Sequence, residues 1–98
     1  MLLDRKINPR DLQYYCEREG MLVLAFVFIR AEADTGSRVG SQIAKIEGVD
    51  ESYELTGDID IIAKVSTRNM DELSKILFRI RGTKGVLGTD TRVVLAKF

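Results

Sequence analysis

The amino-acid sequence predicts an α+β domain of the ferredoxin-like type, with the element order βαββαβ. Strand-like and helix-like segments follow one another in two similar halves, and each helix is followed by a Gly-Val pair that opens a strand, at 48–49 and 85–86. Between the halves lies Gly57-Asp58, a two-residue turn signal flanked by strand-like runs. The expected architecture is a four-stranded antiparallel sheet with two helices on one face.

The first half is expected to contain a strand, a helix and a second strand. The strand from Met21 to Ile29 is apolar on both faces, so both faces must be covered. Cap candidates at 35–37 begin a helix that ends at Gly48 and presents three apolar residues at i, i+4 and i+7, namely Val39, Ile43 and Ile46. In the next strand, 49–55, one side is expected to consist of Val49, Glu51, Tyr53 and Leu55.

The second half repeats this order after the Gly57-Asp58 turn. A strand from Ile59 to Val65 is expected to turn its odd-numbered residues inward, with Asp60, Ile62 and Lys64 on the other side. Asn69 and Glu72 suit the start of a helix that ends at Gly82 and carries Leu73, Ile76, Leu77 and Ile80 on one face. The last strand is expected from Val86 to about Phe98, because this segment is rich in β-branched residues.

Composition limits the possible functions. Fifteen basic and fifteen acidic residues cancel, no basic face is visible along the sequence, and we therefore expect no direct binding of nucleic acid. Histidine is absent and Cys16 is the only cysteine, which excludes an intramolecular disulfide and a Cys/His zinc cluster. We accordingly expect no metal, no cofactor and no catalytic residue.

Residues 1–20 form a leader whose composition differs from that of the rest. Asn8-Pro9 followed by a Gly stop at Gly20 predicts a short helix there. Charged residues come almost at once after the start, so we expect no secretory signal, and the apolar run 21–29 is too short to span a bilayer. The expected location is the cytoplasm, without membrane contact.

Two helices cover only one face of a ferredoxin-like sheet. Because the first strand is apolar on both sides, we expect the other face to meet a second copy of the chain in a two-fold dimer.

Four segments, in the right order and at matching intervals, resemble the effector-binding (RAM) domain of the Lrp/AsnC family of regulatory proteins. They are 25–29, 46–49, 55–60 and 85–91, and the resemblance extends along residues 21–98. It implies a dimeric α/β barrel, further assembly into rings such as octamers, and amino acids or similar small effectors bound between dimers. Family members normally carry a helix-turn-helix domain that a leader of 20 residues cannot hold. The chain therefore resembles a stand-alone form that acts in transcriptional regulation or amino-acid sensing without DNA binding of its own.

The resemblance also implies the effector site, whose residues would be Thr56, Gly57, Asp58, Asp60, Thr89 and Thr91. A glycine turn exposes backbone N–H groups to a carboxylate, hydroxyls donate or accept, and a carboxylate binds an ammonium group. The alternatives are a plain tight turn for Gly57-Asp58 and strand propensity for the two threonines. Asp60 interrupts an apolar strand, which indicates either a site or an interface ion pair, with Lys64 as the rival partner.

Two other functions remain open at this point. One is a structural role in co-assembly with full-length Lrp/AsnC regulators. The other is that of a dimeric α/β-barrel enzyme, such as a small monooxygenase or a haem-degrading protein; the lack of histidine and of a nucleophile–base pair argues against it.

Overall fold

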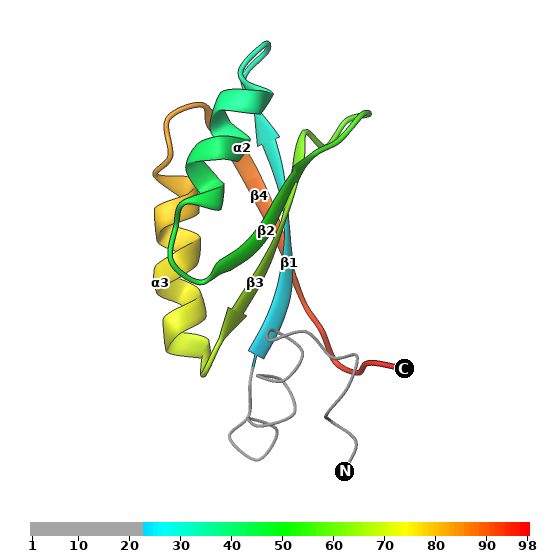
Figure 1. Ribbon diagram of the computed structural model, residues 1–98, viewed down its shortest axis with the longest axis vertical. Coiled ribbons are helices and arrows are strands. Elements are labelled where there is room, and N and C mark those ends of the chain that lie inside the picture. The colour runs from blue at the N-terminus through cyan, green and yellow to red at the C-terminus, as the bar shows by residue number, and fades with distance from the viewer. Residues whose placement is uncertain (1–22) are drawn as a thin grey trace, which may run out of the picture.

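The computed structural model describes residues 23–98 (Figure 1). Its elements are β1 (Val23–Ala31), α2 (Gly36–Ala44), β2 (Val49–Glu54), β3 (Ile61–Thr67), α3 (Met70–Arg81) and β4 (Val86–Val93). The strands form one antiparallel sheet in the order β2-β3-β1-β4. The predicted fold class and element order are confirmed. The leader 1–20 and its predicted helix lie outside the described residues.

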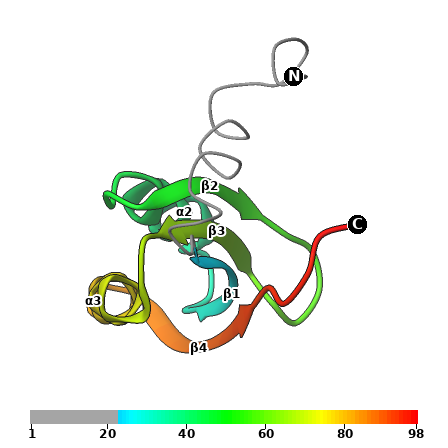
Figure 2. The same cartoon turned by 90° about the horizontal axis from the view of Figure 1, so that it is seen from below.

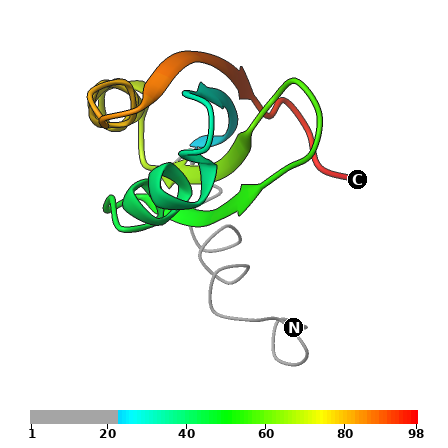
Figure 3. The same ribbon diagram turned by 90° about the horizontal axis from the view of Figure 1, so that it is seen from above.

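Both helices lie on the same side of the sheet, as the two views along the long axis show (Figures 2 and 3). The core between the two layers is entirely aliphatic; it consists of Ala25, Val27, Ile29, Ala31, Val39, Ile43, Ile61, Ala63, Val65, Leu73, Ile76 and Ile80. No helix within residues 23–98 is long and apolar enough to cross a membrane.

β1 occupies the interior of the sheet and is apolar on both faces, as expected. Ala25, Val27 and Ile29 are 0% exposed beneath the helices. The alternate residues point to the other side of the sheet, which we call the open face; its apolar part consists of Leu24, Phe26, Phe28, Tyr53 and Ile62. No helix within residues 23–98 lies on the open face, which is flanked by the ion pairs Lys64–Glu51 and Arg92–Asp90.

The glycines of the two Gly-Val pairs have matching roles in the two halves. Gly48 precedes β2 with φ +102°, and a Cβ atom there would lie 2.2 Å from Cδ1 of Ile76 on α3. Gly85 precedes β4 with φ +99°, and a Cβ atom there would lie 2.8 Å from Cγ2 of Val39 on α2. Each turn therefore permits the helix of the other half to pack closely, and only glycine satisfies both the backbone and the space.

The start of α3 is capped from both directions. Oδ1 of Asn69 accepts the backbone N–H of Glu72 at 2.9 Å, and the Glu72 carboxylate accepts the N–H of Arg68 at 3.0 Å. The predicted helix start is confirmed, although the return bond reaches one residue before the cap instead of the cap itself. α2 is shorter than predicted: it ends at Ala44, and Ile46 packs against the core from the turn that follows.

Three strand predictions are corrected by the structure. Val49 does not share a face with Glu51, because a bulge between them shifts the register: Val49 pairs with core-facing Val65, and Glu51 pairs with Lys64. β3 begins at Ile61 instead of Ile59. β4 ends at Val93, well before Phe98, because Val93 pairs with Ala25, which lies close to the first residue of β1.

Candidate functional site

The tip of the β2–β3 hairpin is open to solvent. Thr56, Gly57 and Asp58 are all exposed, and the tip projects beyond the rest of the sheet (Figure 1). Gly57 has φ +104°, and a Cβ atom placed on it would meet nothing within 4 Å. The backbone conformation therefore requires glycine here, whereas space does not. The backbone bond from Leu55 N–H to the carbonyl of Asp60, at 2.8 Å, closes the loop below the tip.

Asp60 lies at the base of this loop and fastens it to β1. One of its carboxylate oxygens, Oδ2, accepts the N–H of Ala31 at 2.8 Å, and its own N–H donates to the carbonyl of Ile29 at 3.0 Å. These bonds fall where the pairing of β1 with β4 shifts register, between Arg30 and Ala31. The second oxygen, Oδ1, makes no hydrogen bond to any group in residues 23–98. A half-buried carboxylate is thus held in place by one oxygen while the other is free to bind a cation.

Lys64, the rival partner proposed from sequence, has an ion pair elsewhere. Its Nζ lies 3.8 Å from Oε2 of Glu51, directly across the β2–β3 ladder. The bond that explains the position of the Asp60 carboxylate is the one to Ala31.

Thr89 and Thr91 lie on β4, opposite Ile29 and Val27 of β1. Directly paired residues share a face of the sheet, so both threonines are on the helix side. Both are half-buried, and within the described part of the chain neither hydroxyl is hydrogen bonded. Strand propensity explains the presence of threonine at these positions, and the free hydroxyls leave a ligand contact possible.

One chain brings five of the six predicted residues to the same end of the sheet, with Thr91 opposite the middle of β1, but does not enclose them. Ile29 pairs with Ile61 on one side and with Thr89 on the other, so Asp60 and Thr89 are separated by β1. The hairpin tip extends away from both, and none of the six residues lines the cleft described next. A ligand held by all of them needs a neighbouring surface to close the site.

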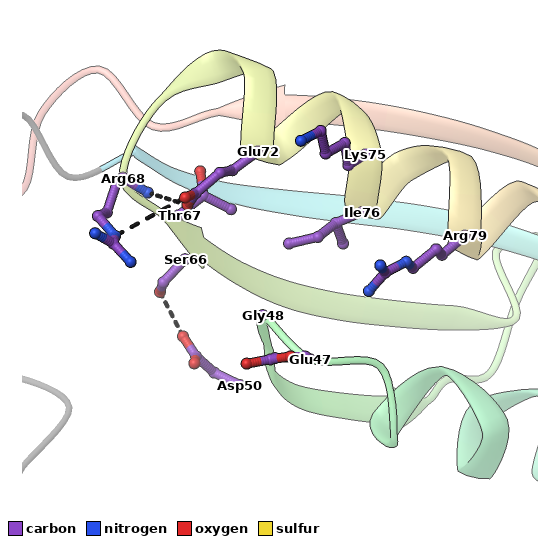
Figure 4. A pocket seen from close by; sticks show the side chains of 10 residues that line it. All are labelled: Glu47, Gly48, Asp50, Ser66, Thr67, Arg68, Glu72, Lys75, Ile76 and Arg79. Carbon is purple, nitrogen blue, oxygen red and sulfur yellow. Dashed lines mark hydrogen bonds and ion pairs between the residues drawn. The ribbon is translucent and has the colours of Figure 1, made fainter.

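A cleft that the sequence did not indicate lies at the other end of β3 (Figure 4). It has a volume of about 470 Å³ and lies between the turn before β2 and the side of α3 that runs from Glu72 to Arg79. Its lining carries both signs of charge and consists of Glu47, Gly48, Asp50, Ser66, Thr67, Arg68, Glu72, Lys75, Ile76 and Arg79. Arg68 forms an ion pair with Glu72, with 3.8 Å between Nε and Oε2, and the Ser66 hydroxyl donates a hydrogen bond to Oδ2 of Asp50. The lining comes from separate segments, so no local motif indicates it; the one sequence signal is Gly48, whose missing side chain leaves room for Ile76.

Comparison with known proteins gives a consistent result. The family model of the Lrp/AsnC ligand binding domain matches residues 24–98. The HTH-type transcriptional regulator FL11 of Pyrococcus furiosus is 37% identical over 89 residues, which are 91% of this chain and 54% of that protein. The chain therefore spans about half the length of the curated regulators it matches. A homocitrate synthase of Sulfolobus acidocaldarius is 36% identical over 76 residues, but the match covers only 16% of that enzyme.

Solved structures agree with the sequence comparisons. A protein from Thermus thermophilus superposes with a TM-score of 0.73 at 30% identity, covering 78% of this chain and 96% of that one. A feast or famine regulatory protein from M. tuberculosis, complexed with L-methionine, superposes with a TM-score of 0.70 at 28% identity. That match covers 97% of this chain and 60% of the other.

Proposed function

The chain belongs to the family of Lrp/AsnC ligand-binding domains, and from this premise we propose that it is an oligomeric module that binds a free amino acid or a similar small zwitterion in a regulatory role. The observation that carries the proposal is the Asp60 carboxylate, which is anchored through Oδ2 and has Oδ1 free beside the hairpin loop. The L-methionine complex of the M. tuberculosis relative supports the class of ligand.

The groups around Asp60 suit the two charges of a zwitterion. The free oxygen of Asp60 would accept the ammonium group in a charge-assisted hydrogen bond. Backbone N–H groups at Gly57-Asp58 would bind the carboxylate, because no side chain at Gly57 blocks their approach. Thr56 lies beside this turn, and Thr89 or Thr91 would supply a hydroxyl to a remaining polar atom.

Assembly would complete this site. The open face presents a contiguous apolar strip that includes Phe26, Phe28 and Ile62, and a second copy of the chain is the partner we propose for it. The hairpin tip projects away from the core of its own protomer, so a neighbouring dimer in a ring such as an octamer would enclose the ligand. This arrangement explains why one chain has the polar groups without a closed pocket.

A thermal-shift screen of the twenty amino acids, followed by calorimetric titration of the best ligand, tests the proposal. A ligand at about 100 times its Kd adds roughly 2.7 kcal/mol to the free energy of unfolding, which gives a clear rise in melting temperature. The oligomeric state is followed by light scattering in the same buffer. Assembled protein that no amino acid stabilises would contradict effector binding.

Co-assembly with a full-length family regulator is the second candidate. It is favoured by the 37% identity to the corresponding half of a helix-turn-helix regulator, since similar open faces could form mixed dimers. Mixing the two proteins and measuring the mass of the product distinguishes hetero-assembly from separate homo-oligomers. We propose no catalytic activity, because the match to the transcriptional regulator covers 91% of this chain and 54% of that protein, whereas the match to the homocitrate synthase covers 76% of this chain and only 16% of that enzyme.

A further inference from the structure

A second groove lies on the helix side of the sheet, between α2 with the turn that follows it and the end of α3 with the turn that follows that helix (Figures 2 and 3). Its volume is about 380 Å³, and its lining residues are Arg38, Gln42, Ile46, Arg79, Thr83 and Lys84. Three of these six are cationic and none is acidic. The lining thus differs from that of the mixed-charge cleft in Figure 4, with which it shares only Arg79.

The three cations of the groove form no ion pair with an acidic side chain in the described part of the chain. Within residues 23–98, the ion pairs involve Lys64, Arg68 and Arg92, and none involves Arg38, Arg79 or Lys84. The whole chain has a formal net charge of zero, so this grouping is local. Like charges brought together from separate elements repel one another, and an anion in the groove would relieve that repulsion.

Arg38 lies at a position where the helix dipole is unfavourable to a cation. It lies in the first turn of α2, which contains no acidic residue, although the positive end of the helix dipole favours acids there. Its Nη2 atom lies 3.6 Å from the position that a Cβ atom on Gly85 would take, so the guanidinium extends from α2 to the turn that carries Lys84. Arg79, in the last turn of α3, is explained by the dipole of its own helix, whereas Arg38 is not.

We propose that this groove binds a small multivalent anion bearing phosphate or carboxylate groups. Arg38 and Arg79 would each offer a planar fork that matches two anionic oxygens, and Lys84 would add a compact point charge. The amide of Gln42 supplies a further donor, and the volume is that of a small-molecule site. None of the residues of the amino-acid site lines the groove, so the two proposals are independent.

Calorimetric titration of the full chain with sodium tripolyphosphate and with citrate, at constant ionic strength, tests the groove. The test variant is Arg38→Gln combined with Lys84→Gln, and the controls are Arg81→Gln and Lys45→Gln, exposed cations on the same helix layer that do not line the groove. The double variant should lose about tenfold or more in affinity, since charge-assisted hydrogen bonds are removed, whereas each control should change by less than about twofold. The tighter-binding probe identifies phosphate or carboxylate as the preferred group.

Three results would overturn the assignment. The first is no binding of either probe at millimolar concentration. The second is an equal loss in the control variants, which would mean that the probes sense only general surface charge. The third is that a poly-glutamate peptide binds more tightly than both small anions and that its affinity depends on Arg38 and Lys84. The groove would then be a protein-docking surface. Both groove substitutions are at exposed positions, and a melting curve of each variant checks that the fold is retained.

Discussion

The carboxylate of Asp60 accepts the backbone N–H of Ala31 at 2.8 Å, and so joins the start of β3 to the end of β1 across 29 residues of sequence. Ala31 is only 8% exposed, so water is a poor substitute for this acceptor. Asp60 therefore stabilises the sheet end in addition to the ligand-binding role proposed for it. Substitutions at this position must separate the two roles.

Asp60→Ala and Asp60→Asn provide that separation. Alanine leaves the Ala31 N–H without its acceptor and should lower the free energy of unfolding by about 1–3 kcal/mol. Asparagine keeps an acceptor oxygen, so most of this stability should remain in chemical denaturation. It loses the negative charge, however, and should weaken amino-acid binding by roughly tenfold in calorimetry. Wild-type affinity in assembled Asp60→Asn would contradict the role of Asp60 as the ammonium acceptor.

The special role of Asp60 can be predicted from the sequence, but its hydrogen-bond partner cannot. An acid beside an apolar strand was a visible break in pattern, and the break did mark a residue with a specific bond. The pattern could not indicate the partner, because Ala31 is a main-chain donor that the β1 bulge places there, and a backbone N–H has no signature in a sequence. A bulge also explains why the prediction that Val49 and Glu51 share one side is wrong: alternation assumes regular pairing, and one bulge reverses it.

Gly48→Ala and Gly57→Ala form a matched pair that separates backbone strain from steric conflict. The two glycines have nearly the same φ, +102° and +104°, so a Cβ atom adds a similar conformational cost of about 1–2 kcal/mol at each. At Gly57 nothing lies within 4 Å, whereas at Gly48 the new atom would lie 2.2 Å from Cδ1 of Ile76. Denaturant unfolding should therefore show a distinctly larger loss for Gly48→Ala. Equal losses would mean that the Ile76 side chain moves aside freely.

Asn69→Ala should destabilise α3 from its first turn. The substitution removes the acceptor of the Glu72 N–H, which typically costs about 1 kcal/mol. Asn69→Asp keeps a side-chain acceptor at the same position and adds a negative charge that the helix dipole favours, so it serves as the control and should retain wild-type stability. Thermal unfolding monitored by circular dichroism measures both. An unchanged melting temperature in Asn69→Ala would show that another group replaces the cap.

The fold was predictable because it rests on repeated local signals, namely apolar periodicity in two helices and a glycine before each of two strands. The two grooves were not predictable, because their linings combine residues from separate segments. Arg38 lies far from Arg79 and Lys84 in the sequence, and neither segment predicts a groove by itself. The fold brings α2 near the C-terminal end of α3 and so creates a local cationic groove in a chain whose total charge is balanced.

Phe26 and Val27 are neighbours in the chain but face opposite sides of β1, and an aspartate at each position distinguishes the core from the proposed dimer face. Val27 is 0% exposed beneath the helices, so Val27→Asp buries an unpaired carboxylate and should prevent folding.

Phe26 lies on the open face, directly opposite Lys64 on β3 and Arg92 on β4. An aspartate there would have two cations beside it in the monomer, so Phe26→Asp should fold. In the dimer this aspartate would place a charge in an apolar interface, so the expected species is a folded monomer. Its circular dichroism spectrum should match that of the wild type, and its mass in light scattering should be half that of the dimer. Phe78→Asp, on an exposed helix position that is 70% accessible, is the matched control and should leave both assembly and fold unchanged. Phe26→Asp that still forms dimers would show that the open face is not where two copies meet.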